Sequence, residues 1–410
     1  MTTFLKDELL DAQVQRTLGT AGAGGADLGE CLAAVAAVDG TDLDSWHAAW
    51  TAVADRLRRL AEAEEAAGNR ESARGAYLRA GSYYRTAGVL LFTAPVDPRL
   101  AECDARQREM FTAAFRLMDL PPERVRIPFE GGTLPGWFFP AAADGQPRAT
   151  LILTGGYDGP CEELYLLTGA AALRRGYHVL AFDGPGQGAA LLQQGLTMRP
   201  DWETVVAAAV DHTVARPEVD PERVALVGLS LGAHLAPRAA SAEHRLAALV
   251  ADCGAFSLYE GFLARMPASL ATGLRENRAW ARLAVRVVTA RVLRKPTAGW
   301  ALRRGMQVHG VRSPLAYLDV LRDYTLAGRA ERITCPTWVC NAENDDIGAS
   351  APELVARLTC PHEFVRFTAA DGAGDHCEAG ARSRYHAESF RWLDALLRPR
   401  EDSERMKPAS

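Results

Sequence analysis

Short apolar runs that alternate with helical segments dominate the sequence from residue 149 onward. The runs are ATLILTGG, HVLAFDG, RVALVGLS, LAALVADCG, TCPTWVCNAEND and HEFVRFTAADG. The segments with helical patterns between and after them include 161–175, 201–216, 231–243 and 380–398. Strands that are buried on both faces have nearly continuous apolar sequences, and helices commonly connect parallel strands. The alternation therefore predicts an α/β fold whose mainly parallel sheet is covered by helices on both faces.

Two other segments break this alternation. Residues 124–140 alternate in polarity and turn at Glu130-Gly131-Gly132, which predicts a β-hairpin ahead of the parallel strands. Residues 256–332 have a helical pattern and no convincing strand. Insertions after strand ends commonly cover the site that the strands build, so we expect a helical lid here.

The first part of the chain has only helical patterns. Over 46–60, apolar residues recur at spacings of three and four, which lines one helical face. We expect Asp44 or Ser45 to cap this helix and Gly68-Asn69 to end it. A second stretch over 73–91 has the same spacing, so the two helices are expected to form an antiparallel hairpin within an all-α N-terminal cap domain.

The predicted division of the chain follows from these patterns. Residues 1–120 are expected to form the helical cap domain, and 256–332 the helical lid. The α/β core is expected to have two parts, 121–255 and 333–400, and residues 401–410 are expected to be a flexible tail. A chain of 410 residues suits one large domain with such an appendage.

Composition excludes several classes of function. A formal net charge of −5 argues against nucleic acid as a partner, because phosphate binding needs a basic surface. No apolar run approaches the roughly 18 residues of a membrane span, and the start lacks the basic and apolar regions of a signal peptide. The eight cysteines include no CxxC pair, which predicts reduced, buried thiols in a cytoplasmic protein and neither a metal site nor a cofactor.

One serine lies where an apolar run ends and a helical segment begins. Ser230 is the centre of GLSLG at 228–232, which has the strand–turn–helix setting of a nucleophile elbow. Such a turn holds the serine in an unfavourable backbone conformation at the carboxyl edge of the sheet, and its glycines let strand and helix approach closely. The alternative is an incidental serine in a tight turn. The setting favours a nucleophile.

A serine hydroxyl needs a base to take its proton and an acid to orient that base. In this type of fold the acid and then the histidine follow the serine, each after a later strand. We predict Asp345, after the run TCPTWVCNAE, as the acid, with Asp346 as the alternative and Glu343 as a weaker one. His376 follows the last apolar run and precedes the final helix. No other histidine has that placement, so His376 is the predicted base.

The reaction also needs backbone donors for a developing oxyanion. We predict the amide of Leu231 as one donor and the amide of Gly156 or Tyr157, in the loop TGGYDG, as the other. A second glycine-rich loop, DGPGQG at 183–188, lacks the lysine and hydroxyl residue of a phosphate-binding loop. We expect this second loop to be a structural turn.

Together these motifs resemble the α/β-hydrolase superfamily over roughly 125–398. The strings TGGYDGPCEELY, FDGPGQG, GLSLG, AEND and GAGDHCEAGARS, preceded by SWHAAW and AYLRAGSYYRTA, are similar to one group within it. That group includes the 2,6-dihydroxypseudooxynicotine hydrolases, the fungal polyketide chain-shortening hydrolases and bacterial proteins near the FrsA group. The resemblance implies an α/β-hydrolase fold, a substrate enclosed by cap and lid, and catalytic roles for Ser230, Asp345 and His376.

The predicted function is that of a serine hydrolase that cleaves a carbon–carbon bond of a β-ketone, or an ester, in a hydrophobic small molecule of polyketide, other secondary or aromatic metabolism. Acyl transfer, cyclisation or acyl elimination by the same triad stays open, as does a non-catalytic binding protein on the same scaffold. In the lid, Tyr259 and Glu260 are candidates for substrate binding, with an exposed helix position as the alternative for Glu260. The expected partner is a small molecule, with no nucleic acid and no membrane; a homodimer is left open.

Overall fold

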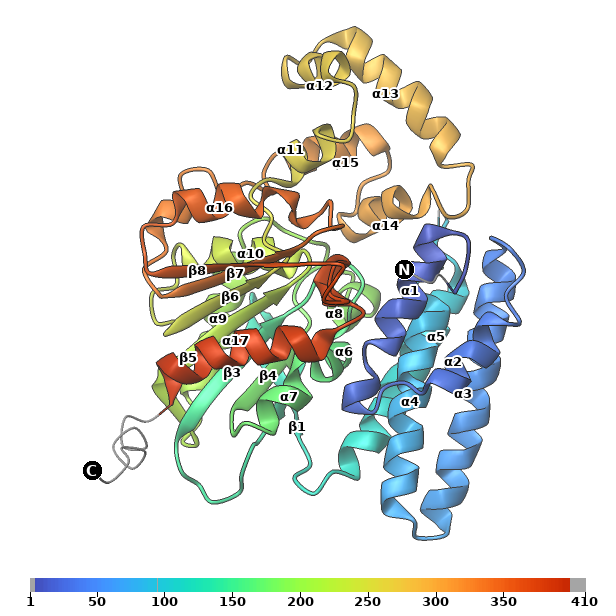
Figure 1. Cartoon of the computed structure of the whole chain (residues 1–410), viewed down its shortest axis with the longest axis vertical. Helices are drawn as coiled ribbons and strands as arrows, with labels where there is room; N and C mark the ends of the chain where they lie inside the picture. Colours follow the sequence, from blue (N-terminus) through green and yellow to red (C-terminus); the bar gives the residue numbers. More distant parts are fainter. Residues whose placement is uncertain (1–3, 94, 399–410) are drawn as a thin grey trace.

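One eight-stranded sheet forms the centre of the protein (Figure 1). The computed structural model describes residues 4–93 and 95–398, and its strands have the order β1-β2-β4-β3-β5-β6-β7-β8. The strands are β1 (Glu123–Phe129), β2 (Gly132–Phe139), β3 (Arg148–Thr154), β4 (His178–Phe182), β5 (Val219–Leu229), β6 (Ala248–Asp252), β7 (Thr337–Ala342) and β8 (His362–Phe367). β1 and β2 form an antiparallel hairpin, β2 pairs antiparallel with β4, and all other neighbours are parallel. The predicted hairpin and mainly parallel sheet are confirmed.

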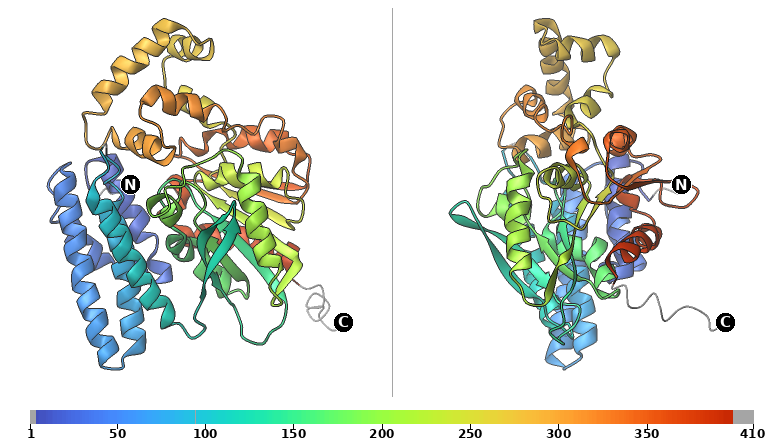
Figure 2. Two further views of the ribbon diagram at one scale, coloured as in Figure 1. Left: turned by 180° about the vertical axis from the view of Figure 1, so that it is seen from behind. Right: turned by 90° about the vertical axis from the view of Figure 1, so that its left-hand side faces the viewer.

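Helices cover both faces of this sheet. α17 (Arg382–Leu397) crosses one face, and α9 (Trp202–Val214) and α10 (Gly232–Ala240) cover the other (Figures 1 and 2). Shorter helices complete the core: α6 (Cys161–Leu164), α7 (Ala170–Leu173), α8 (Gly188–Leu192), α16 (Ala351–Arg357) and the 3₁₀ turns η3 (Ala330–Arg332), η4 (Gly348–Ser350) and η5 (His376–Glu378). The helix expected over 161–175 contains a π-helical turn, η2 (Tyr165–Gly169), between α6 and α7.

The N-terminal part is helical and packs beside the sheet (Figure 1). Its elements are α1 (Glu8–Leu18), η1 (Ala21–Ala23), α2 (Leu28–Val35), α3 (Leu43–Ala66), α4 (Arg70–Gly88) and α5 (Pro98–Arg116). The expected hairpin is α3 and α4. Its predicted cap is wrong: Asp42 caps α3, because its carboxylate accepts the amides of Asp44 and Ser45 at 3.0 and 3.2 Å. Gly68 follows the helix in a left-handed conformation (φ +80°), as the sequence indicated.

The segment between β6 and β7 contains five helices and projects from the core (Figure 2). They are α11 (Leu258–Leu263), α12 (Ala268–Arg275), α13 (Ala279–Val292), α14 (Trp300–Val308) and α15 (Pro314–Leu321). Most of their buried apolar side chains form a cluster separate from that of the main body. This cluster includes Leu263, Leu274, Val285, Met306 and Leu318, whereas Trp300 and Val308 of α14 pack in the core of the main body. The segment predicted to be the lid therefore has a packed interior of its own.

The predicted division of the chain into a cap domain, a two-part core and a lid stays a prediction. The tail proposed for 401–410 lies outside the described residues. Within the described part of the chain, no helix combines the length and apolar character that a membrane crossing requires.

A buried ion cluster joins cap, core and lid. Asp158, in the loop after β3, accepts hydrogen bonds from Arg16 of α1 at 2.7 Å and from Arg85 of α4 at 3.5 Å. It is also paired with Arg304 of α14. Glu163 shares the cluster and binds Arg16 at 2.6 Å. Burial raises the pKa of Asp158, but the three arginines outweigh burial and hold that pKa far below its usual value. The carboxylate therefore stays charged.

We expect Asp158→Asn to lower the free energy of unfolding by about 3–5 kcal/mol, because it leaves buried guanidinium groups without their counter-charge. The Asp158 side chain is only 6% exposed. Urea denaturation followed by fluorescence measures the change. Asp144→Asn is the matched control, since Asp144 pairs with Arg148 on the surface and is 50% exposed. An equal loss of stability in both variants would contradict the role of the buried cluster.

Candidate active site

Ser230 lies at the tight turn between β5 and α10. Its φ of +60° is left-handed, a conformation that is costly for a residue with a side chain. The glycines on either side have no room for a side chain. A Cβ at Gly228 would lie 2.0 Å from the carbonyl oxygen of Gly232. A Cβ at Gly232 would lie 2.4 Å from the carbonyl oxygen of Thr154 in β3. The turn has the geometry expected of a nucleophile elbow.

The structure brings the three predicted catalytic residues into one hydrogen-bonded chain. His376 Nε2 lies 2.8 Å from Ser230 Oγ, and His376 Nδ1 lies 2.9 Å from Asp345 Oδ2. Asp345 follows β7 and His376 follows β8, so both reach the same sheet edge as the elbow. The second oxygen of Asp345 accepts the Ile347 amide at 2.9 Å, which fixes the carboxylate plane.

The surroundings distinguish Asp345 from its neighbour. The Asp345 side chain is 1% exposed. Burial raises the pKa of Asp345, but His376 and further hydrogen bonds outweigh this and lower it to about 2. Asp346 is 83% exposed and lies 4.0 Å from Arg265. Burial disfavours the charged form of His376, yet Cys377 and Asp345 raise its pKa well above the usual value. Asp345 is thus the carboxylate that orients the histidine.

The predicted oxyanion donors flank the serine. A Cβ at Gly156 would lie 3.0 Å from Ser230 Oγ and 3.2 Å from the Leu231 nitrogen, so a side chain there would fill the space beside the nucleophile. Among the described residues, the amides of Gly156, Tyr157 and Leu231 donate to no protein acceptor. These amides are therefore free to donate to a substrate oxygen.

Gln187, in the glycine-rich loop expected to be structural, braces the oxyanion loop. Its side-chain amide donates to the Gly155 carbonyl at 2.7 Å, and its carbonyl accepts the Gly184 amide at 3.0 Å. In the same loop, Asp183 accepts the amides of Cys161 and Ala189. No sequence motif pointed to this role of Gln187.

Tyr157 connects the oxyanion loop to the lid. Its hydroxyl lies 3.0 Å from His309 Nε2 and 3.1 Å from the hydroxyl of Tyr317, both from the lid region. The guanidinium of Arg304 stacks on its ring. The lid is thereby attached directly to the loop that carries a predicted oxyanion donor.

The two lid candidates for substrate binding are engaged by arginines. The hydroxyl of Tyr259 accepts a hydrogen bond from Arg322, whose guanidinium also lies over its ring. The carboxylate of Glu260 pairs with Arg275 at 2.6 Å, and its side chain is 48% exposed. This matches the alternative stated for Glu260, an exposed helix position. A role of either residue in substrate binding stays a prediction.

Two cysteines near the histidine were missed as site residues. Cys377 directly follows His376, and its Sγ lies 3.6 Å from His376 Nε2. Cys253, after β6, accepts the Cys377 amide at 3.0 Å. The signal was present in the sequence: one cysteine adjoins the predicted base and the other ends a neighbouring apolar run. The scattered spacing of the cysteines had predicted that their thiols are buried. For Cys377 this prediction is wrong, because the residue is only partly buried.

A small cavity lies between α4, α5 and the loop of Asp158. Its volume is about 40 Å³, and Arg85, Asp104 and Tyr157 are among its lining residues. Pockets for organic ligands usually measure about 300–1,000 Å³. This cavity is too small for such a ligand, and neither Ser230 nor His376 lines it. It belongs to the junction of cap and core.

We expect buried His234 to make the fold sensitive to acid. Its Nδ1 lies 2.9 Å from the Ala255 carbonyl, and burial lowers its pKa to about 4. Because the unfolded histidine titrates near 6.5, the unfolded state gains protons first as the pH falls from about 6.5 to 4, and stability is lost over that window. Between pH 7 and 5 this residue accounts for about 2 kcal/mol.

Urea unfolding at the two pH values tests this in His234→Gln, which retains a hydrogen-bond donor. The difference in unfolding free energy between pH 7 and 5 should shrink in this variant. His244→Gln, at an exposed position, should retain the wild-type difference. An unchanged difference in His234→Gln would show that His234 is not responsible.

The fold and the arrangement at the sheet edge are those of an α/β hydrolase. The model of the alpha/beta hydrolase family matches residues 151–382, more than half of the chain, and the protein belongs to this family of enzymes. Hydrolase acrC of Aspergillus aculeatus is 35% identical over 96% of this chain and 98% of its own length. The 20-hydroxy-prefusarin hydrolase FUS2 of Gibberella moniliformis is 33% identical over 98% of this chain and all of its own.

Among solved structures, the 2,6-dihydroxy-pseudo-oxynicotine hydrolase has a similar fold. Its TM-score is 0.74 at 22% identity, over 93% of this chain and 96% of the other. The match extends beyond the sheet and therefore includes helical parts outside it.

Proposed function

We propose that this enzyme is a serine hydrolase in which Ser230, His376 and Asp345 form the catalytic triad. The observation that carries the proposal is the position of His376, whose two ring nitrogens lie within hydrogen-bonding distance of Ser230 Oγ and Asp345 Oδ2. A buried carboxylate on Nδ1 selects the tautomer that presents a lone pair on Nε2 to the serine.

The reaction begins when Ser230 Oγ attacks a substrate carbonyl carbon and His376 Nε2 takes the hydroxyl proton. The carbonyl oxygen becomes an oxyanion, which the amide of Leu231 and that of Gly156 or Tyr157 stabilise by donating hydrogen bonds. Collapse of the tetrahedral intermediate breaks the bond to the leaving group, and His376 returns the proton to it. Water then attacks the acyl-serine with the same base and releases a carboxylic acid and free Ser230.

Leaving-group chemistry decides which bonds are cleaved. From an ester, the leaving group departs as an alcohol after protonation on oxygen. From a β-ketone substrate, the leaving group departs as an enolate, whose charge the adjacent ketone delocalises. Protonation of this enolate by His376 yields the shorter ketone. Both reactions need the same nucleophile, base and oxyanion donors, so we propose that the acyl group of an ester or a β-ketone is transferred to water.

The proposed substrate is a hydrophobic small molecule of polyketide, other secondary or aromatic metabolism. Two comparisons support a small organic substrate with hydroxyl groups: one relative is named for 20-hydroxy-prefusarin, and one solved structure for 2,6-dihydroxy-pseudo-oxynicotine. Where lid and oxyanion loop meet, the hydroxyls of Tyr157 and Tyr317 and the imidazole of His309 are bonded to one another, so a substrate hydroxyl that reached them would replace one of these contacts.

The test uses two substrates with the same acyl group, an aryl ester and a 1,3-diketone, with product analysis by mass spectrometry. We expect both to give the same carboxylic acid, together with the phenol or the shorter ketone. Ester turnover without diketone cleavage would contradict the carbon–carbon reaction. Acyl products joined to an added alcohol instead of water would favour acyl transfer. A fluorophosphonate should label wild type at Ser230, and failure to label the folded enzyme would contradict the nucleophile.

A further inference from the structure

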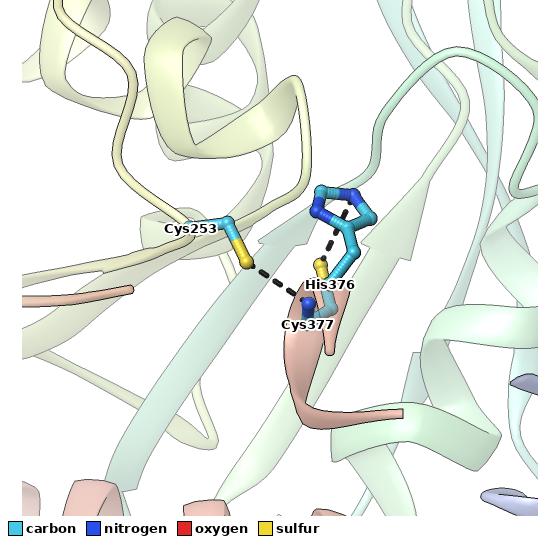
Figure 3. Close-up of side chains that lie close together, drawn as sticks. All are labelled: Cys253, His376 and Cys377. Atoms are coloured by element: carbon cyan, nitrogen blue, oxygen red, sulfur yellow. Dashed lines mark hydrogen bonds between the residues drawn. The ribbon is translucent and has the colours of Figure 1, made fainter. Parts of the chain in front are cut away.

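Three metal-binding side chains meet beside the candidate active site. The sulfur atoms of Cys253 and Cys377 and a ring nitrogen of His376 all lie within 4.8 Å of one another (Figure 3). The two cysteines come from different parts of the chain, the end of β6 and the turn after β8. The hydrolytic reaction proposed above uses neither thiol, so the cluster needs a separate explanation.

The backbone holds both cysteines in place. Cys253 has φ +70° and Cys377 has φ +52°, left-handed conformations that are rare for residues with side chains. The Cys377 amide donates to Cys253 Sγ at 3.0 Å, which fixes the two segments relative to each other. Cys377 Sγ is turned toward His376 Nε2, at 3.6 Å. The three donor atoms therefore converge on one place beside Ser230.

The donor set suits a thiophilic divalent cation. Zn²⁺ binds thiolate sulfur and imidazole nitrogen, and sites with two cysteines and one histidine leave a fourth position open. The His376 side chain is 35% exposed, so an ion can reach the cluster from solvent.

Two other groups of potential ligands in the described chain are less suitable. The group of Cys340, Asp252 and Glu378 is fully buried, and both of its carboxylates pair with Arg382. The group around Asp183, also fully buried, uses that carboxylate to accept two backbone amides. A cation at either place would have to displace existing partners.

We propose that Cys253, Cys377 and His376 bind Zn²⁺ and that the bound ion inhibits the enzyme. On binding, the two thiols release their protons to solvent, and the lone pair of His376 that would accept the Ser230 proton goes to the metal. No bond of the substrate is involved. The inhibition rests on the proposed function, whereas the binding does not.

Metal binding is tested first, without reference to activity. Reduced Ser230→Ala protein, which retains all three donors, is titrated with Co²⁺ as a spectroscopic substitute for Zn²⁺. We expect one equivalent to give a thiolate-to-cobalt charge-transfer band that Zn²⁺ abolishes. Cys377→Ser and Cys253→Ser, each made in this background, should weaken binding by at least about tenfold. Cys360→Ser, at a buried cysteine outside the cluster, should bind as the parent does.

Inhibition is then measured with wild type and an aryl ester. Zn²⁺ should abolish turnover, and a chelator should restore it. Each cysteine variant is compared with its own metal-free rate, and should need at least about tenfold more Zn²⁺ for half inhibition. Cys377 is partly exposed, so its variant is expected to fold even where that of Cys253 fails. No charge-transfer band, or unchanged affinity in folded Cys377→Ser, would overturn the site; binding without inhibition would overturn its effect on the enzyme.

Discussion

Replacement of Ser230 by alanine is expected to lower kcat for an aryl ester by up to about 10⁶-fold, the effect seen when a serine hydrolase loses its nucleophile. The change removes only Oγ, the atom that lies 2.8 Å from His376 Nε2 and would form the acyl intermediate. Oxyanion donors and the binding surface stay in place, so the Michaelis constant should change little. Steady-state kinetics measures both constants.

Ser241→Ala is the matched control for this experiment. Ser241 lies at the end of α10, the helix that Ser230 precedes, and its hydroxyl donates to the Arg238 carbonyl at 2.7 Å. Its loss is expected to leave kcat within about a factor of two, since the hydroxyl is remote from the carbonyl chemistry. If Ser230→Ala retained wild-type turnover while folded, another group would have to be the nucleophile.

Most of the fold could be predicted from local sequence patterns. The apolar runs overlap β3 to β8, and β4, β6 and β7 are buried along their whole length because helices cover both faces of the sheet. The edge strand β8 is more polar and partly exposed. The turn at Ser230 was recognisable because its glycines have no substitute: the carbonyl of Gly232 leaves no room for a side chain at Gly228. Chain order then located Asp345 and His376 at the same edge.

Long-range contacts account for what the sequence did not show. Arg16, Arg85 and Arg304 lie far apart in the chain, and each alone resembles a surface arginine; only the tertiary fold makes them partners of Asp158. The same applies to Cys253, which meets Cys377 across the sheet edge. The start of α3 was misplaced by two or three residues because several polar residues there were plausible caps and only backbone geometry selects among them.

The lid is the part where sequence patterns said least about function. Glu260 follows β6 closely enough in the sequence to suggest a place in the pocket. In the structure, however, its carboxylate is hydrogen-bonded to Arg275, fifteen positions later in the chain. Helical periodicity predicts that α11 and α12 exist but not how they fold against each other. Any part for Glu260 in proton transfer requires that ion pair to open first.

Two adjacent aspartates allow a sharp test of the triad acid. Asp345→Asn is expected to lower kcat by about 10⁴-fold, because an amide at this position stabilises the wrong histidine tautomer and cannot compensate the imidazolium. Asp346→Asn is expected to leave kcat within about a factor of two, since a solvent-exposed carboxylate 4.0 Å from Arg265 has little influence on His376. Steady-state kinetics on the same ester compares the two variants.

The alternative assignment predicts the reverse. If Asp346 were the acid, Asp346→Asn would be the damaged enzyme and Asp345→Asn the active one. Fluorophosphonate labelling adds a second readout: Asp345→Asn should label far more slowly than wild type, because the reagent needs a deprotonated Ser230. Asp345→Glu separates the effect of charge from that of position. It retains a carboxylate, but the longer side chain, at a position where the native side chain is only 1% exposed, displaces that carboxylate from His376 Nδ1. We therefore expect partial recovery of labelling in Asp345→Glu, and equal rates in the Asn and Glu variants would contradict an electrostatic role of this carboxylate.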